Sequence, residues 1–170
     1  VPAVVSAQKA LGSKNVPDAL CCITQCKNAI ALNHLIAGKD GDILDVEATP
    51  DKCGILLPDR DIMTHSNHFL THFLQASDMA DQTSFPDTFL RQYRMKQLME
   101  DHYGELSVEI MMELLKDHRG YPDSICRHCD ETGPEEEKFR TLISLISLPG
   151  EGKLYASPQP CEAPYQEFSL

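Results

Sequence analysis

The stretch NHLIAGKDGDILDVEATPDKCGILLPD, residues 33–59, alternates short apolar runs with turn residues. The turns KDGD and TPDK combine Asp, Gly and Pro, and Gly41 and Gly54 can adopt positive φ. With the apolar residues on either side, this pattern predicts an antiparallel meander of four short strands. The expected strands lie near 30–37, 42–48, 53–57 and 61–65.

Helical spacing of apolar residues brackets the meander on both sides. The pair before it includes VPDAL, where Pro17 suits the first turn of a helix, and the pair after it follows a polar loop at 75–87. The expected helices span 2–12, 16–27, 87–104 and 107–120.

Two further β-like runs, KFRTLISLISL (138–148) and KLYASPQ (153–159), are joined at PGEG and predict a hairpin. The order is helices, sheet, helices and sheet. It predicts an α+β class with antiparallel sheets, and 170 residues with 42% apolar content suit a single domain.

Charge and hydropathy exclude two classes of partner. The formal charge of −11, from 26 acids and 15 bases, argues against a nucleic-acid surface. No run approaches the roughly 18 apolar residues of a membrane-spanning helix, so no membrane partner is expected. The chain starts at Val1 without a signal-peptide pattern, so we expect part of a longer, cytoplasmic protein.

Seven cysteines are an odd number and favour reduced thiols over a disulfide scaffold. The segment CRHC, residues 126–129, is one C-x-x-C and supplies only half of the four ligands that a structural zinc needs, so we expect structural or incidental thiols here. Recruitment of His68 or Cys161 stays open. The cysteines are Cys21, Cys22, Cys26, Cys53, Cys126, Cys129 and Cys161.

The stretch MTHSNHFLTHFL, residues 63–74, holds three histidines around Asn67. A helix would bring His68 and His72 to one face, whereas His65 at a strand end would leave in another direction. There is no HExxH and no G-x-S-x-G, so we expect no metal and no serine hydrolase. A non-catalytic or metal-binding module built on these histidines with Cys126 and Cys129 remains the alternative.

Several segments in a fixed order resemble one known family. Glu47 also ends the second expected strand as that family tends to have it. The matching segments are 1–20, 33–59, MTHSNHFL (63–70), RQYRM (91–95), YPDSICRH (121–128) and 138–170. Together they resemble the acyl-coenzyme A:isopenicillin N acyltransferase family, also called peptidase family C45, which comprises cysteine N-terminal-nucleophile (Ntn) hydrolases.

The resemblance implies an αββα sandwich of which residues 1–170 form the C-terminal portion. The family nucleophile is a cysteine exposed by self-cleavage, whose own α-amine acts as the base on an amide or thioester substrate. That cysteine would precede Val1 in the precursor, and none of the seven cysteines replaces it. The fragment alone is therefore expected to be inactive and to need the N-terminal part of its precursor. No cofactor is implied, although acyl-coenzyme A could be a substrate.

The resemblance also implies roles for particular residues. Asn67 matches the asparagine that donates to the oxyanion of the tetrahedral intermediate, with His65 and His68 as orienting residues. Arg127 would hold a carboxylate, either of the substrate or of the missing N-terminal part, with a structural ion pair as the alternative. Lys138 stands where penicillin-forming members have arginine, which changes the geometry of that contact.

Overall fold

The computed structural model describes residues 2–76, 86–132 and 139–169. The chain divides into two compact units, Val1–Asp81 and Gln82–Leu170. Within the described ranges, no helix combines the length and the apolar character needed to cross a bilayer.

The first unit contains a three-stranded antiparallel sheet. The sheet has the order β1-β2-β3, so three of the four predicted strands are confirmed. In the turn after β1, Gly41 has φ 92°, a conformation that favours glycine. The strands are β1 (Leu32–Ala37), β2 (Ile43–Ala48) and β3 (Cys53–Leu56).

The predicted fourth strand at 61–65 is wrong. Arg60 and Asp61 have φ of 49° and 61°, so the chain reverses there and leaves only one isolated bridge, between Asp59 and Ile62. Further along, the backbone N–H groups of Leu70 and Thr71 donate to a side chain of β2 instead of to a neighbouring strand.

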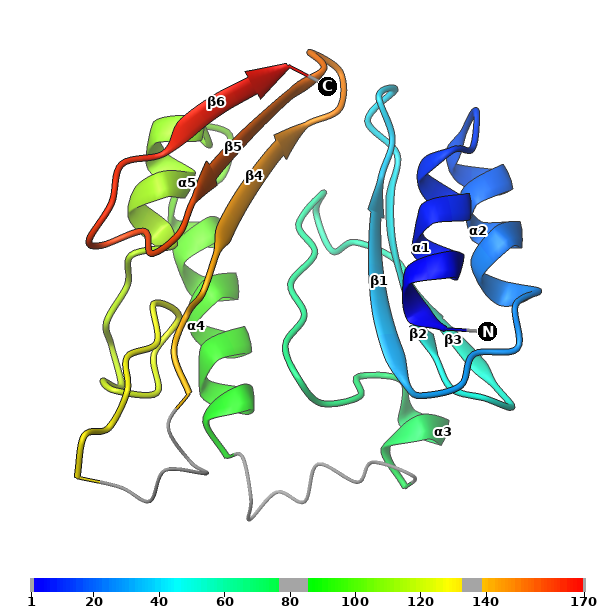
Figure 1. The fold of residues 1–170 in the computed structure, drawn as a ribbon, viewed down its shortest axis with the longest axis horizontal. Helices are drawn as coiled ribbons and strands as arrows, with labels where there is room; N and C mark the ends of the chain where they lie inside the picture. The colour runs from blue at the N-terminus through cyan, green and yellow to red at the C-terminus, as the bar shows by residue number, and fades with distance from the viewer. Residues whose placement is uncertain (1, 77–85, 133–138, 170) are drawn as a thin grey trace. The chain divides into compact units, whose positions relative to one another are not determined.

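Helices α1 (Ala3–Leu11) and α2 (Val16–Thr24) pack together, and α2 contacts β1 and β2 (Figure 1). The Asn15 side chain caps α2 by accepting from the N–H of Asp18 at 2.8 Å, and Pro17 occupies the first turn. Both predicted helices are confirmed, although α2 ends three residues before the expected position 27.

Side-chain alternation along β2 gives its two faces different characters. Val46 and Ala48 face the helices and form a core with Ile23. Asp45 and Glu47 face the other way, yet both are fully buried. The first unit therefore buries two carboxyl groups on the sheet face opposite its apolar core.

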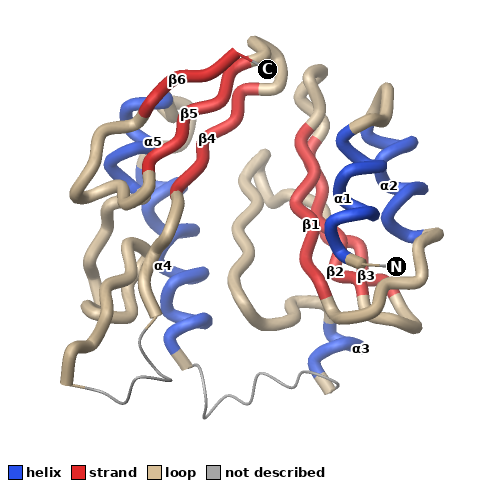
Figure 2. Tube along the Cα trace, in the orientation of Figure 1, coloured by secondary structure: helices blue, strands red, loops and turns tan. Residues whose placement is uncertain are grey.

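The second unit also combines helices with a three-stranded antiparallel sheet, in the order β4-β5-β6 (Figure 2). Helix α5 contacts β4, and the predicted hairpin at PGEG is confirmed. The strand β6 was missed, because QEFS has four exposed residues and no apolar alternation. The elements are α4 (Asp87–Asp101), α5 (Val108–Leu114), β4 (Ser144–Leu148), β5 (Lys153–Ser157) and β6 (Gln166–Ser169).

The predicted α+β class with antiparallel sheets is confirmed. Both predicted helices of the second unit are confirmed, but α5 ends at Leu114 rather than near Gly120. Turns follow it from Leu115. Most of the predicted loop at 75–87 and residue Lys138 lie outside the described residues.

Candidate functional site

The carboxylate of Glu47 joins the sheet of the first unit to the segment that follows it, residues 65–71. Its Oε1 accepts from Nε2 of His65 at 2.7 Å and from the backbone N–H of Leu70. Its Oε2 accepts from the N–H of Thr71 at 2.8 Å. One buried side chain therefore fixes both ends of an irregular segment.

His65 lies between oxygen atoms on both sides of its ring. Nδ1 is 2.6 Å from the backbone oxygen of Ser66. Nε2 forms the hydrogen bond with Glu47 and also lies 3.8 Å from Oδ2 of Asp45. Both ring nitrogens of His65 therefore face oxygen atoms, and the ring is held between the sheet and the segment that follows it.

The two carboxyl groups respond to burial in opposite ways. Burial alone would raise the pKa of Glu47, but the hydrogen bonds from His65 and from the N–H groups of Leu70 and Thr71 lower it below the usual range. At Asp45 burial dominates and raises the pKa, and the nearby His65 only partly opposes this. Both side chains are inaccessible to solvent, which favours a structural role over proton transfer to a substrate.

Gly54 allows the 65–71 segment to approach the sheet. It lies opposite Glu47 in the antiparallel register, and a Cβ at this position would be 2.2 Å from Oγ1 of Thr71. Because Thr71 supplies one of the N–H donors to Glu47, the missing side chain at Gly54 is a condition for that bond.

Asn67 occupies the middle of the anchored segment, and its side chain is exposed. Its Oδ1 accepts a hydrogen bond from Oγ of Ser66 at 3.5 Å. The N–H groups of the side-chain amide therefore lie on the side of the amide away from Ser66. His65 precedes Asn67 with its ring held by Glu47, and Leu70 and Thr71 follow with their N–H groups held by the same carboxylate.

The three histidines of this stretch do not form a metal-binding group. His68 is buried and its ring centroid is 6.5 Å from that of His65, whereas His72 is exposed at the start of α3 (His72–Gln75). Within 2–76, 86–132 and 139–169, the only group of three or more potential metal ligands consists of other residues, all in the second unit.

Arg127 is engaged by carboxylates of its own unit. Its Nη2 donates to Asp123, Nη1 is 3.4 Å from Oδ2 of Asp87, and the guanidinium lies 5.5 Å from the centroid of the Phe139 ring. This geometry is that of a structural ion pair. The other predicted basic residue, Lys138, lies outside the described part of the chain.

The arginines of the RQYRM segment also have structural partners. Arg91 bonds Asp87 at 2.8 Å, and Arg94 donates to Oδ2 of Asp117 from Nη2 at 2.7 Å and from Nε at 3.1 Å. The backbone oxygen of Asp117 in turn accepts from the N–H of Cys126 at 3.0 Å. Asp117 therefore connects α4 to the SICRH segment (residues 124–128), a link that no sequence motif indicated.

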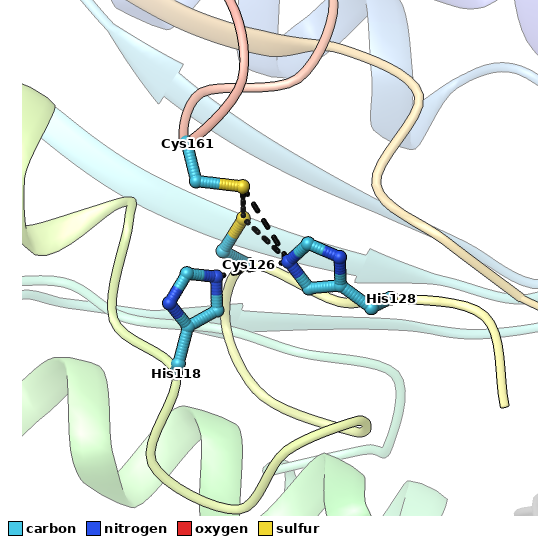
Figure 3. A group of neighbouring side chains, drawn as sticks. All are labelled: His118, Cys126, His128 and Cys161. Carbon is cyan, nitrogen blue, oxygen red and sulfur yellow. Dashed lines mark hydrogen bonds between the residues drawn. The ribbon is translucent and has the colours of Figure 1, made fainter.

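The cysteines of the CRHC segment do not act together. Cys126 lies against Cys161, with 3.2 Å between the sulfur atoms, and His118 and His128 adjoin them, whereas Cys129 is outside this group (Figure 3). Burial, and next the hydrogen bond with Cys161, raise the pKa of Cys126 to about 11. In the absence of a metal ion, a thiol with a raised pKa is a weaker nucleophile than a thiolate.

Comparison with known proteins assigns the chain to a family. Residues 9–158 match the family described as acyl-coenzyme A:6-aminopenicillanic acid acyl-transferase. Since the match spans most of the sequence, the chain belongs to this family of acyltransferases and related hydrolases. The resemblance drawn from MTHSNHFL and YPDSICRH is thereby confirmed. No curated protein matches the chain.

We predict that Glu47→Gln destabilises the protein by about 3 kcal/mol, because an amide cannot accept from His65, Leu70 and Thr71 as a carboxylate does. The free energy of unfolding in urea measures this. The exposed Glu105→Gln is the matched control and should change it by less than about 0.5 kcal/mol. Equal effects of the two substitutions would contradict the role of Glu47.

The stabilisation from Glu47 should also depend on pH. Because its pKa is lower in the folded than in the unfolded protein, the contribution is complete above the ordinary value of 4.5 and is lost as pH falls through the folded value. The difference in unfolding free energy between the wild type and Glu47→Gln should therefore shrink below about pH 4.5. A difference that stays constant down to pH 3 would show that charge plays no part.

Gly54→Ala should destabilise the protein by about 2 kcal/mol, because the added Cβ meets Thr71. Thr71→Gly removes the obstructing side chain, so the double variant should show a favourable coupling energy in urea unfolding. Gly12→Ala is the control, since its Cβ would be 3.6 Å from the nearest atom. Strict additivity of the Gly54 and Thr71 substitutions would exclude a steric contact.

Proposed function

We propose that this chain is the C-terminal part of a self-processing cysteine Ntn hydrolase or acyltransferase that acts on amide or thioester bonds. The family match over residues 9–158 carries the proposal. It is supported by the anchored 65–71 segment, which presents Asn67 at the surface of the first unit.

The proposed reaction proceeds through an acyl-cysteine intermediate. Self-cleavage upstream of Val1 frees the α-amine of a cysteine, and this amine takes the proton of the thiol. The sulfur attacks the substrate carbonyl and forms a tetrahedral intermediate whose oxygen is negatively charged. Collapse of the intermediate expels the amine or thiol of the substrate with that proton. Water or a second amine then attacks the thioester and releases the cysteine.

In this scheme Asn67 donates from its side-chain amide to the tetrahedral oxyanion, together with the backbone N–H of the nucleophile. A donor of this kind stabilises the transition state only if it is held in place before the charge develops. Glu47 provides that constraint, because its bonds to His65 and Thr71 lie on both sides of Asn67. His65 is then a positioning residue, and His68 packs beside it.

The same proposal extends to the architecture. Each unit contributes helices and a three-stranded antiparallel sheet, which are the components of an αββα sandwich. We infer that residues 1–170 are the C-terminal portion of one such domain and that the N-terminal part of the precursor completes it. Arg127 then has a structural role through its ion pairs with Asp87 and Asp123.

Other features of the proposed function stay predictions. The substrate is a small-molecule amide or acyl thioester, with acyl-coenzyme A as one candidate, and no cofactor takes part. Lys138 remains a candidate for contact with a substrate carboxylate. A cytoplasmic location also remains a prediction.

Asn67→Asp is the most direct test of the site, because it removes the N–H donor and preserves the shape of the side chain. In the processed full-length enzyme, we expect the rate of acyl-cysteine formation from an acyl-coenzyme A thioester to fall by about 10²–10³. Intact-mass measurement of the acylated chain against time gives this rate. Unchanged thermal unfolding would show that the loss is not due to misfolding.

Ser66→Ala is the neighbouring control and should retain most of the activity, because its 3.5 Å contact with Asn67 is weak. Acylation of the Asn67→Asp variant at the wild-type rate would exclude the oxyanion role. A processed wild-type enzyme that forms no covalent adduct with any amide or thioester tested would overturn the proposed function.

A further inference from the structure

We propose that His118, Cys126, His128 and Cys161 form a tetrahedral zinc site in the second unit. This proposal is independent of the acyl-transfer function. The ligand atoms of the four side chains all lie within 4.8 Å of one another. Figure 3 shows the two sulfur atoms and the two imidazole rings directed toward a common point.

The four residues come from three separate parts of the second unit. His118 follows α5, Cys126 and His128 belong to the SICRH segment, and Cys161 lies in the turn between β5 and β6. Cys126 is fully buried, Cys161 and His128 are half-buried, and His118 is exposed. From the sequence, the CRHC segment offered Cys126, with Cys161 as an open possibility, but neither His118 nor His128 was singled out as a ligand.

The distances agree with the edges of a zinc coordination tetrahedron. Typical zinc–sulfur and zinc–nitrogen bonds imply edges of about 3.8 Å between two sulfurs, 3.3 Å between two nitrogens and 3.5 Å between sulfur and nitrogen. The corresponding distances here are 3.2 Å for Cys126–Cys161, 2.9 Å for His118–His128, and 3.8 and 3.4 Å from Nε2 of His128 to Cys126 and Cys161. These four distances differ from the ideal edges by up to about 0.6 Å, and the two from His118 to the sulfur atoms are at most 4.8 Å, so His118 would move to complete the tetrahedron.

The surrounding contacts hold the ligands in position. The N–H of His128 donates to the oxygen of Pro122 at 3.0 Å, and Oγ of Ser124 donates to the oxygen of Cys126 at 2.6 Å. Buried Gln159 contacts Nδ1 of His128 at 3.4 Å through its amide group. Rotation of this amide by half a turn lets its oxygen accept the Nδ1–H, the arrangement that zinc-binding histidines require when Nε2 binds the metal.

The donor set selects zinc and a structural role. Two thiolates and two neutral imidazoles are typical of structural zinc, and two thiolates neutralise the charge of the ion. Four protein ligands leave no open position for substrate or water. The ion would join the SICRH segment to the β5–β6 turn and so stabilise the second unit.

A Cys126–Cys161 disulfide is the competing interpretation, since the sulfur atoms are close. Both cysteines are free thiols here. A disulfide would use only the two sulfur atoms and leave His118 and His128, whose Nε2 atoms lie 2.9 Å apart, in contact with each other beside it. The zinc site uses all four side chains.

The test is the metal content of the full-length protein, purified without chelator from zinc-supplemented medium. We expect about one zinc per chain by plasma mass spectrometry, and cobalt substitution should give the visible spectrum of a tetrahedral site with sulfur ligands. Removal of the metal by a chelator should lower the melting temperature, and zinc should restore it. These measurements use the wild-type protein, so they do not depend on the folding of a variant.

Variants identify the ligands. Cys161→Ser and His118→Ala should each lose most of the bound zinc, whereas Cys129→Ala and His102→Ala are matched controls outside the group and should retain it. Less than about a tenth of an equivalent of zinc in the reduced wild type would overturn the proposal. It would also be overturned by an intact mass two hydrogens lower, from a Cys126–Cys161 disulfide, or by equal zinc loss in Cys129→Ala.

Discussion

The hydrogen bonds of the Glu47 carboxylate are the constraint on which the candidate acyl-transfer site depends. Glu47 is fully buried on β2, where an unpaired charge would be costly, and it is satisfied by His65 and by the N–H groups of Leu70 and Thr71. The cost of burying the charge is offset only when the 65–71 segment adopts this one conformation. The position of Asn67 therefore follows from an acid on the neighbouring sheet, and Gly54 leaves the space that the arrangement needs.

Polar contacts organise the second unit in a similar way. Arg94 donates to the carboxylate of Asp117, and the backbone oxygen of Asp117 accepts from the N–H of Cys126. These hydrogen bonds connect α4 to the SICRH segment. Arg127, within that segment, pairs with Asp87 and Asp123. The basic residues of the family motifs RQYRM and SICR thus stabilise the scaffold. The exposed Asn67 of the first unit is the residue proposed for a direct role in acyl transfer.

The sequence predicted the parts that depend on local periodicity and missed those that depend on distant contacts. Helices α1, α2 and α4, strands β1 to β3 and the β4–β5 hairpin follow from apolar spacing and turn residues. The strand expected at 61–65 failed because positive φ at Arg60 and Asp61 reverses the chain. The pairing of Glu47 with His65, and of Cys126 with Cys161, joins residues 18 and 35 positions apart, and no local pattern encodes such contacts. The family resemblance suggested Asn67 as a candidate, and the structure adds the hydrogen bonds that anchor the segment around it.

The central claim is that this chain completes an enzyme that cleaves itself to expose a catalytic cysteine. The most direct measurement is the intact mass of the protein expressed from the gene extended upstream of Val1. We predict two chains whose masses sum to that of the precursor plus one water, with cysteine at the new N-terminus of the downstream chain. Substitution of that cysteine by alanine should leave one uncleaved chain. A precursor that stays intact in its folded state, or a cleaved chain that begins with a residue other than cysteine, would contradict the account.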